Sequence, residues 1–182
     1  MNIVMIGAGY VGLVSGACFA EFGANVICVD SDKKKIEQLK KGIMPIYEPG
    51  LEDLVTRNNK SGRLIFTDNL SEAMDSADIV FIAVGTPTRR GDGHADLKYV
   101  FGVAEELAIE IKQYTVIVDK STVPVGTARE VKRIILEKNP KANFDIASNP
   151  EFLREGSAIA DFMRPDRVIL GLENARAENL LR

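Results

Sequence analysis

The amino-acid sequence predicts an α/β fold in which a doubly wound, mainly parallel sheet carries helices on both faces. Two observations lead to this prediction. Short apolar runs typical of buried strands alternate with helix-like segments along the whole chain. The first apolar run ends in a glycine-rich turn that opens a helix, as in the first βα unit of a Rossmann-type sheet.

Each strand is expected as a short apolar run before a turn, at residues 2–6, 25–29, 64–67, 79–84, 116–119, 144–147 and 167–171. Helical periodicity is expected at residues 14–22, 32–41, 70–74, 97–112, 128–138 and 175–182. In the second of these helices, Ile36 and Leu39 should face the core. The less regular stretch 42–63 should form a helix and a loop. Because there is no internal repeat or linker, residues 1–182 are expected to form one domain.

The composition is that of an ordinary globular protein, with 46% apolar and 27% charged residues. The net charge of −3 offers no basic footprint, so no nucleic-acid partner is expected. No apolar run approaches the roughly 20 residues of a membrane span, so no membrane partner is expected. Met1 leads directly into a strand-like run instead of a secretory leader, which predicts a cytoplasmic protein.

The histidine and cysteine content argues against a metal site. His94 is the sole histidine, and Cys18 and Cys28 lack the spacing of zinc ligands, so no metal is expected. His94 lies in a polar, glycine-rich loop that should face solvent. The two cysteines fall within a helix and a strand, where packing explains them better than nucleophilic chemistry.

The first motif with a chemical meaning is G-A-G-Y-V-G at residues 7–12. In this pattern Gly7 permits a tight turn, Gly9 lets the backbone approach a pyrophosphate, and Gly12 allows close packing of helix and strand. Asp30 ends the second strand 18 residues after Gly12, near the roughly 20-residue spacing of a ribose-binding acid. The alternative is a simple tight turn followed by a helix-capping aspartate.

Asp30 favours NAD over NADP, because a carboxylate accepts a hydrogen bond from a ribose hydroxyl and repels a 2′-phosphate. Lys33, Lys34 and Lys35 follow and could weaken that preference, although a solvated helix face explains at least two of them. NAD is therefore the expected cofactor.

Three further motifs follow later strands: V-G-T-P-T at residues 84–88, K-S-T-V-P-V-G-T at 120–127 and N-P-E-F-L-R-E-G at 149–156. Glycine and proline at such places also mark ordinary turns. In a parallel sheet, however, the carboxyl ends of the strands share one edge, where ligands bind near the switch point. We therefore expect these three motifs to border one ligand cleft, together with residues 7–12 and Asp30.

The 149–156 segment is predicted to begin a helix, with Asn149 as the N-cap and Pro150 at the first helical position. Glu151 and Glu155 would then lie four residues apart on one face. Such a carboxylate pair could position a sugar or a water molecule and move protons. An acidic first turn stabilised by the helix dipole explains the same spacing equally well.

Five motifs occur in order: I-G-A-G-Y-V-G-L at residues 6–13, Y-E-P-G-L at 47–51, V-G-T-P at 84–87, K-S-T-V-P-V-G-T at 120–127 and N-P-E-F-L-R-E-G at 149–156. Over essentially the whole chain, this set resembles the UDP-glucose/GDP-mannose dehydrogenase family. Residues 90–97 and 120–127 are most similar to the UDP-glucose 6-dehydrogenase branch. The resemblance implies oxidation of UDP-glucose to UDP-glucuronate with two NAD, through a cysteine-bound thiohemiacetal and thioester.

Transferred by position, the resemblance also implies roles for single residues. The NAD site would comprise Gly7, Gly9, Tyr10, Val11, Gly12, Asp30, Lys35, Thr86, Thr122 and Glu155. The sugar would be held, partly through the backbone, by Glu151, Phe152, Leu153, Arg154 and Glu155. Thr122 and Glu151 would be catalytic, holding a water molecule and shuttling protons.

In this family the nucleophilic cysteine, its lysine and asparagine partners, most of the nucleotide pocket and a long dimerising helix follow the first domain. Neither Cys18 nor Cys28 matches that cysteine. We therefore expect an N-terminal domain that binds NAD weakly without turnover, from a homodimeric parent protein.

Three alternatives stay open at this point. The parent could act on GDP-mannose or a UDP-N-acetylamino sugar, because the missing half should hold the base-recognising pocket. The chain could be an NAD-binding module for sensing or regulation, although a sugar-side carboxylate pair argues against it. It could also be a stable unit without useful affinity, whose exposed apolar surface favours self-association.

Overall fold

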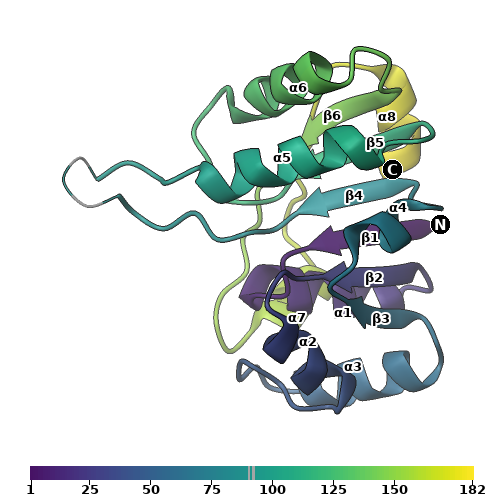
Figure 1. Cartoon of the computed structure of the whole chain (residues 1–182). Helices are drawn as coiled ribbons and strands as arrows, with labels where there is room; N and C mark the ends of the chain where they lie inside the picture. The colour runs from purple at the N-terminus through teal and green to yellow at the C-terminus, as the bar shows by residue number, and fades with distance from the viewer. Residues whose placement is uncertain (90, 92) are drawn as a thin grey trace.

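The computed structural model describes residues 1–89, 91 and 93–182; Arg90 and Asp92, which belong to the 90–97 motif, lie outside the described residues. In the described part, one sheet has the strand order β3-β2-β1-β4-β5-β6-β7. Its strands are β1 (Asn2–Ile6), β2 (Asn25–Val29), β3 (Leu64–Thr67), β4 (Ile79–Ile82), β5 (Thr115–Asp119), β6 (Phe144–Ser148) and β7 (Gly171–Leu172). Neighbouring strands are parallel except β6 and β7. The doubly wound, Rossmann-type prediction is confirmed, with the switch point between β1 and β4 (Figure 1).

Helices cover both faces of this sheet: α1 (Tyr10–Glu21), α2 (Lys33–Lys40), α3 (Leu51–Lys60), α4 (Leu70–Met74), α5 (Lys98–Glu110), α6 (Thr127–Lys138), α7 (Ala158–Met163) and α8 (Ala175–Leu181). One buried cluster joins α1, α2, α3, α7 and α8 to Ile3 and Met5 of β1. A second cluster joins α4, α5 and α6 to Val4 and Ile6. Successive side chains of β1 thus enter opposite cores, which is why residues 3–6 of the strand are all apolar.

Most predicted elements are present, with bounds shifted by a few residues. The first helix begins at Tyr10, four residues before the predicted start, because the glycine turn leads directly into it. The stretch 42–63 contains a loop and then α3, as predicted. Ile36 and Leu39 of α2 are buried, also as predicted. Among the described residues, no helix has the length and apolar character needed to cross a bilayer.

The C-terminal part of the chain departs from the prediction in two places. The strand predicted at residues 167–171 is reduced to β7, a two-residue edge strand antiparallel to β6. Val168 and Ile169 are 65% and 45% exposed, so this apolar run does not enter the core. The second difference is α7, which the sequence analysis does not predict because the expected helix of this region starts at Asn149 instead of Ala158.

Candidate functional site

The glycine turn, residues 7–12, has the geometry that its motif predicts. Gly7 has a φ of +103°, and a Cβ there would lie 2.5 Å from the Ala83 carbonyl oxygen. A Cβ on Gly12 would lie 1.8 Å from the Gly7 carbonyl oxygen. Gly9 differs, because a Cβ there would meet no described atom within 4 Å. Gly7 and Gly12 are thus required by packing, while Gly9 borders open space.

The N-terminus of α1 opens beside that space. Its N-cap residue is Gly9, and in the described structure no side chain caps the first turn, which also holds no acidic residue. The amide groups of a first helical turn have no partner within the helix and carry partial positive charge. Backbone amides at Tyr10 and Val11 therefore suit a phosphate, and the turn fits a dinucleotide.

Asp30 is joined to the glycine turn by its side chain. Its Oδ2 accepts a hydrogen bond from the Ala8 N–H at 2.8 Å and from Lys35 Nζ at 2.8 Å, and its Oδ1 accepts one from the Asp32 N–H. Burial alone would raise the pKa of Asp30, but Lys35 and the two amides hold the pKa below its ordinary value. Asp30 is therefore an ionised acceptor held beside the helix N-terminus.

The three predicted lysines of α2 differ in their surroundings. Lys35 forms the Asp30 ion pair and is partly buried, whereas Lys33 pairs with Asp68 at 3.5 Å and has a largely exposed side chain. Lys34 is exposed and contributes its backbone N–H to the Asp32 cap. Lys35 is thus the one of these three that contacts Asp30, the carboxylate predicted to bind a ribose.

The loops after β4 and β5 are bonded to each other at the same sheet edge. Thr86 Oγ1 donates to the Thr122 carbonyl oxygen at 3.0 Å, and Ser121 Oγ donates to the Val84 carbonyl oxygen at 2.9 Å. The Thr122 side chain is left exposed. The predicted meeting of these two strand-end motifs is therefore found in the fold.

Lys120 is a buried cation that the sequence analysis did not single out. It is 5% exposed, and its Nζ donates to Asn149 Oδ1 at 3.0 Å. The rings of Phe81 and Phe162 lie 5.9 and 5.6 Å from the Nζ. Burial lowers the pKa of Lys120 to about 8, while the charge of Glu151 acts in the opposite direction. Lys120 follows directly after a fully buried strand, and this position was the signal that could have identified it.

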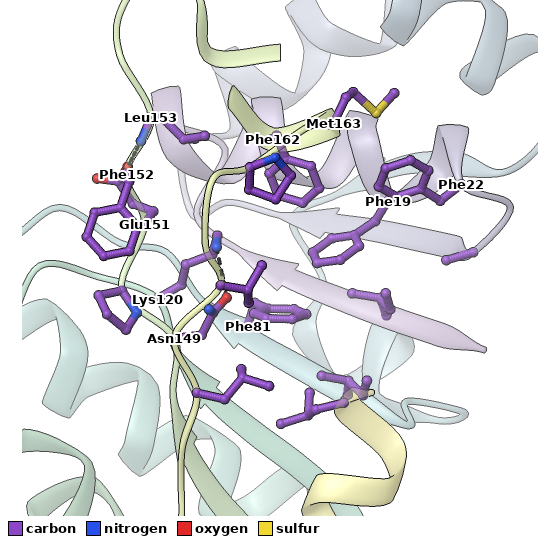
Figure 2. A pocket seen from close by; sticks show the side chains of 18 of the residues that line it. Phe19, Phe22, Phe81, Lys120, Asn149, Glu151, Phe152, Leu153, Phe162 and Met163 are labelled. Carbon is purple, nitrogen blue, oxygen red and sulfur yellow. Dashed lines mark hydrogen bonds between the residues drawn. The ribbon is translucent and has the colours of Figure 1, made fainter. Parts of the chain in front are cut away.

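An apolar cavity of about 640 Å³ extends from Lys120 along the α1 face of the sheet. Figure 2 shows the rings of Phe19, Phe22, Phe81 and Phe162 along it, with Lys120, Asn149 and Glu151 at one end. The glycine turn and Asp30 do not line this cavity. The features predicted to bind the dinucleotide are therefore separate from the cavity.

The predicted helix at residue 149 is wrong. Residues 149–154 form no helix, and α7 begins only at Ala158. Asn149 is not an N-cap, because its side chain accepts from Lys120 and donates through Nδ2 to the Ile169 carbonyl oxygen at 2.9 Å. Tertiary partners thus use the amide that a cap would need. Glu151 and Glu155 consequently do not share a helix face.

The two glutamates of this segment have different environments. Glu151 lines the cavity, and its Oε2 accepts a hydrogen bond from the Leu153 N–H at 2.6 Å. Glu155 lies in an exposed turn and does not line the cavity. Arg154 is anchored to Asp161 through its guanidinium and its backbone N–H, and Arg167 lies 5.2 Å over the ring of Phe152.

Glu48 is the second residue that the sequence analysis missed. It is 5% exposed and accepts hydrogen bonds from Tyr10 Oη at 2.6 Å, the Gly156 N–H at 2.7 Å and the Ala158 N–H at 2.9 Å. Burial would raise the pKa of Glu48, but Tyr10 and the backbone amides hold it below its ordinary value. Its motif was visible at residues 47–51, but its partners lie 38 to 110 positions away in sequence.

Within the described residues, no group of three or more histidine, cysteine, aspartate or glutamate side chains is arranged to hold a metal ion. His94 is exposed in the extension between β4 and α5, where Thr88 and Ala95 form an isolated bridge. The site is therefore built from backbone amides, carboxylates, hydroxyl groups and one buried lysine.

Comparison with known proteins agrees with this geometry. The UDP-glucose/GDP-mannose dehydrogenase family, NAD binding domain, matches residues 1–182. The UDP-glucose 6-dehydrogenase of Rhizobium meliloti is 62% identical over 96% of this chain and 40% of its own length. That of Pseudomonas aeruginosa is 50% identical over 100% of this chain and 41% of its own length.

Solved structures give the same result. A UDP-glucose dehydrogenase from the archaeon Pyrobaculum islandicum superposes with a TM-score of 0.94 at 43% identity, covering 99% of this chain and 42% of that one. A GDP-mannose dehydrogenase from Pseudomonas aeruginosa has a TM-score of 0.94 at 37% identity, covering 100% and 43%. This chain spans about 40% of the length of such curated relatives. With its glycine turn, Asp30 and strand-end loops, the chain belongs to the UDP-glucose/GDP-mannose dehydrogenase family and is an NAD-binding domain of that family.

Proposed function

We propose that this chain is the N-terminal, NAD-binding domain of a UDP-glucose 6-dehydrogenase, which oxidises UDP-glucose to UDP-glucuronate with two NAD. One observation carries the proposal. The hydrogen bond from the Ala8 N–H holds the Asp30 carboxylate beside the uncapped N-terminus of α1, which supports a ribose-binding role for Asp30. The 62% and 50% identical relatives, both UDP-glucose 6-dehydrogenases, support the choice of sugar.

On the NAD side, the chain supplies amides and one carboxylate. The first-turn amides of α1 would bind the pyrophosphate next to the open space at Gly9, and Asp30 would accept from a ribose hydroxyl. Bound NAD supplies the hydride acceptor. Further cofactor contacts are proposed for Tyr10, Val11, Lys35, Thr86, Thr122 and Glu155.

On the sugar side, residues 151–155 are proposed to hold the nucleotide sugar. Their non-helical backbone supports this role, because its N–H and C=O groups are not all used within a helix. Glu151 borders the cavity with its carboxylate oriented by the Leu153 N–H. Together with Thr122 it is proposed to hold a water molecule and to accept a proton from the alcohol.

The second oxidation needs a thiolate that the described cysteines do not provide. Cys18 and Cys28 are both buried, and burial raises the pKa of each thiol to about 12. A thiol in that environment is a poor nucleophile. We propose that the nucleophile and a dimerising helix belong to the remainder of a cytoplasmic, homodimeric parent. The 182-residue chain alone would then bind NAD without turnover.

GDP-mannose is the second candidate substrate of the parent protein. It is supported by the GDP-mannose dehydrogenase that superposes with a TM-score of 0.94. The higher identity of the UDP-glucose 6-dehydrogenases favours UDP-glucose. Comparing binding of UDP-glucose and GDP-mannose to the parent protein distinguishes the two.

The proposal is tested by titrating NAD into the chain by calorimetry, with Asp30→Ala as the test variant. Loss of a hydrogen bond to a charged group should weaken NAD binding by about tenfold or more. Asp68→Ala is the matched control, because Asp68 is a nearby surface carboxylate paired with Lys33. It should leave NAD affinity within about twofold. Absence of NAD binding at millimolar concentration, or equal effects of both variants, would contradict the proposal.

A further inference from the structure

The Glu48 carboxylate joins three parts of the chain that are far apart in sequence. It accepts hydrogen bonds from the Tyr10 hydroxyl at 2.6 Å, the Gly156 N–H at 2.7 Å and the Ala158 N–H at 2.9 Å. Tyr10 belongs to the glycine turn, and Gly156 directly follows the segment 151–155. Glu48 therefore connects the proposed NAD side of the site to the proposed sugar side.

This connection is buried and charge-assisted. Glu48 is 5% exposed, so its hydrogen bonds are poorly screened by solvent. The bonds hold the pKa of Glu48 below its ordinary value despite burial, so the carboxylate stays ionised near neutral pH. In the described structure, Ser157 at the N-cap of α7 makes no side-chain cap bond, and Glu48 accepts from the Ala158 amide in the otherwise uncapped first turn.

The Tyr10 hydroxyl adds a second link to the same segment. It lies 3.4 Å from the Arg154 carbonyl oxygen as well as 2.6 Å from Glu48. Tyr10 is also the first residue of α1, whose N-terminal amides are proposed to bind the pyrophosphate. A ligand that orders this helix start would restrict Tyr10, and through Glu48 it would restrict residues 154–158.

We propose that Glu48 is a positioning residue that, through Tyr10, sets the sugar-side segment relative to the glycine turn and couples NAD binding to nucleotide-sugar binding. The inference rests on the proposed function for the identity of the two ligands. The coupling is reciprocal, so each ligand tightens the binding of the other. Glu48 acts through other groups and touches neither ligand.

Amide hydrogen exchange of this chain tests the inference, because it reports on Gly156 and Ala158 directly. In the unmodified chain, saturating NAD should slow exchange of these two amides by about fivefold or more. Glu48→Gln and Tyr10→Phe, each at NAD concentrations that saturate the glycine turn, should lose this slowing. Retention of the slowing in both variants, or its absence in the NAD-loaded unmodified chain, would overturn the inference.

A matched control removes a similar bond elsewhere. Tyr114 donates to Asp145 Oδ2 at 2.7 Å at the amino-terminal ends of β5 and β6, opposite the strand-end loops of the site, so Tyr114→Phe should keep the NAD-dependent slowing. Loss of the slowing in this control as well would overturn the inference. Tyr10→Phe also keeps the Glu48 amide bonds, so it serves as the test if Glu48→Gln unfolds the chain.

Failure of the proposed function gives a different result. In that case NAD protects no amide of the glycine turn, and the coupling falls with the proposed function. Amide exchange in the ligand-free chain then tests the positioning role of Glu48 separately from the coupling. Tyr10→Phe should speed exchange at Gly156 by about threefold or more, as expected for loss of one buried hydrogen bond. Unchanged exchange would overturn that role too.

Discussion

The glycine turn and the 149–156 segment are both strand-end loops of one site, but they are held in different ways. The glycine turn is held largely by neighbours within its own βαβ unit, through the Ala8–Asp30 bond and the contact of Gly12 with Gly7, although Gly7 also packs against Ala83 and Tyr10 is bonded to Glu48. The 149–156 segment is held by distant groups, through Lys120 at Asn149 and Glu48 at Gly156. The first loop is specified by local sequence, and the second by tertiary contacts.

The difference extends to electrostatics. Asp30 accepts three hydrogen bonds, one of them from Lys35, and has a lowered pKa. At the end of β5, Asp119 accepts one bond, from the Ser121 N–H, and its Oδ2 has no partner in the described structure. Burial raises the pKa of Asp119 to about 7. Charge is therefore compensated at the glycine turn and poorly compensated at the end of β5.

The largest expected effect comes from a substitution that disrupts the local packing of the glycine turn. Gly12→Ala should destabilise the chain by more than about 4 kcal/mol or prevent folding, because its Cβ would overlap the Gly7 carbonyl oxygen. Gly102→Ala is the control, since a Cβ there meets no described atom within 4 Å and Gly102 lies inside α5. It should stabilise the chain by about 0.5–1 kcal/mol. Urea unfolding measures both, and similar results for the two variants would contradict the comparison.

The second effect concerns the uncompensated Asp119. Its folded pKa of about 7 exceeds the ordinary value of 3.8, so the folded state holds the proton more tightly than the unfolded state. Stability from this group is present below pH 4 and is lost as pH rises through about 7, by about 4 kcal/mol. Asp30 and Glu48 have lowered pKa values, so their own contributions to the pH dependence of stability appear only at more acidic pH. Asp119→Asn should reduce the pH dependence of the free energy of unfolding between pH 5 and 7. An unchanged slope of that free energy against pH would contradict this prediction.

The third effect concerns Lys120, the anchor of Asn149. Its folded pKa of about 8 lies below the ordinary 10.5, so the unfolded state binds the proton more tightly. Stability should therefore rise by about 3 kcal/mol as pH increases from 8 to 10.5. In Lys120→Met this rise should disappear from urea unfolding curves measured across that range. Lys132→Met, which removes a partly exposed lysine of α6, should keep it.

The smallest expected effect comes from Gly156, whose replacement is compared with that of Gly12. Gly156→Ala should cost only about 1–2 kcal/mol, because a Cβ there meets no described atom within 4 Å and the cost comes from its φ of +85° alone. Thermal unfolding measures the loss. A loss as large as that of Gly12→Ala would show that the 149–156 segment is also limited by close packing.

Local sequence was sufficient where the structure depends on neighbouring residues. The apolar runs predicted β1, β2 and β3 with their observed bounds, and the glycine motif predicted the turn before α1. The pattern failed at residues 149–154 because the N-cap signature of Asn149 competes with Lys120 and Ile169 for the same amide. It also missed α7, because the same N-cap signature placed the expected helix start at Asn149 instead of Ala158.

The sequence by itself determined the fold class, the family and the shape of the glycine turn, because strand patterns and glycine sterics act over a few residues. Only the tertiary structure decided that Asn149 meets Lys120, that Glu48 meets Tyr10 and Gly156, and that Asp119 is left with an unpartnered oxygen in the described chain. These features depend on burial and on partners up to 110 positions away. Hydrogen bonds and pKa shifts of that kind arise only when the layers of the sheet and helices are packed together.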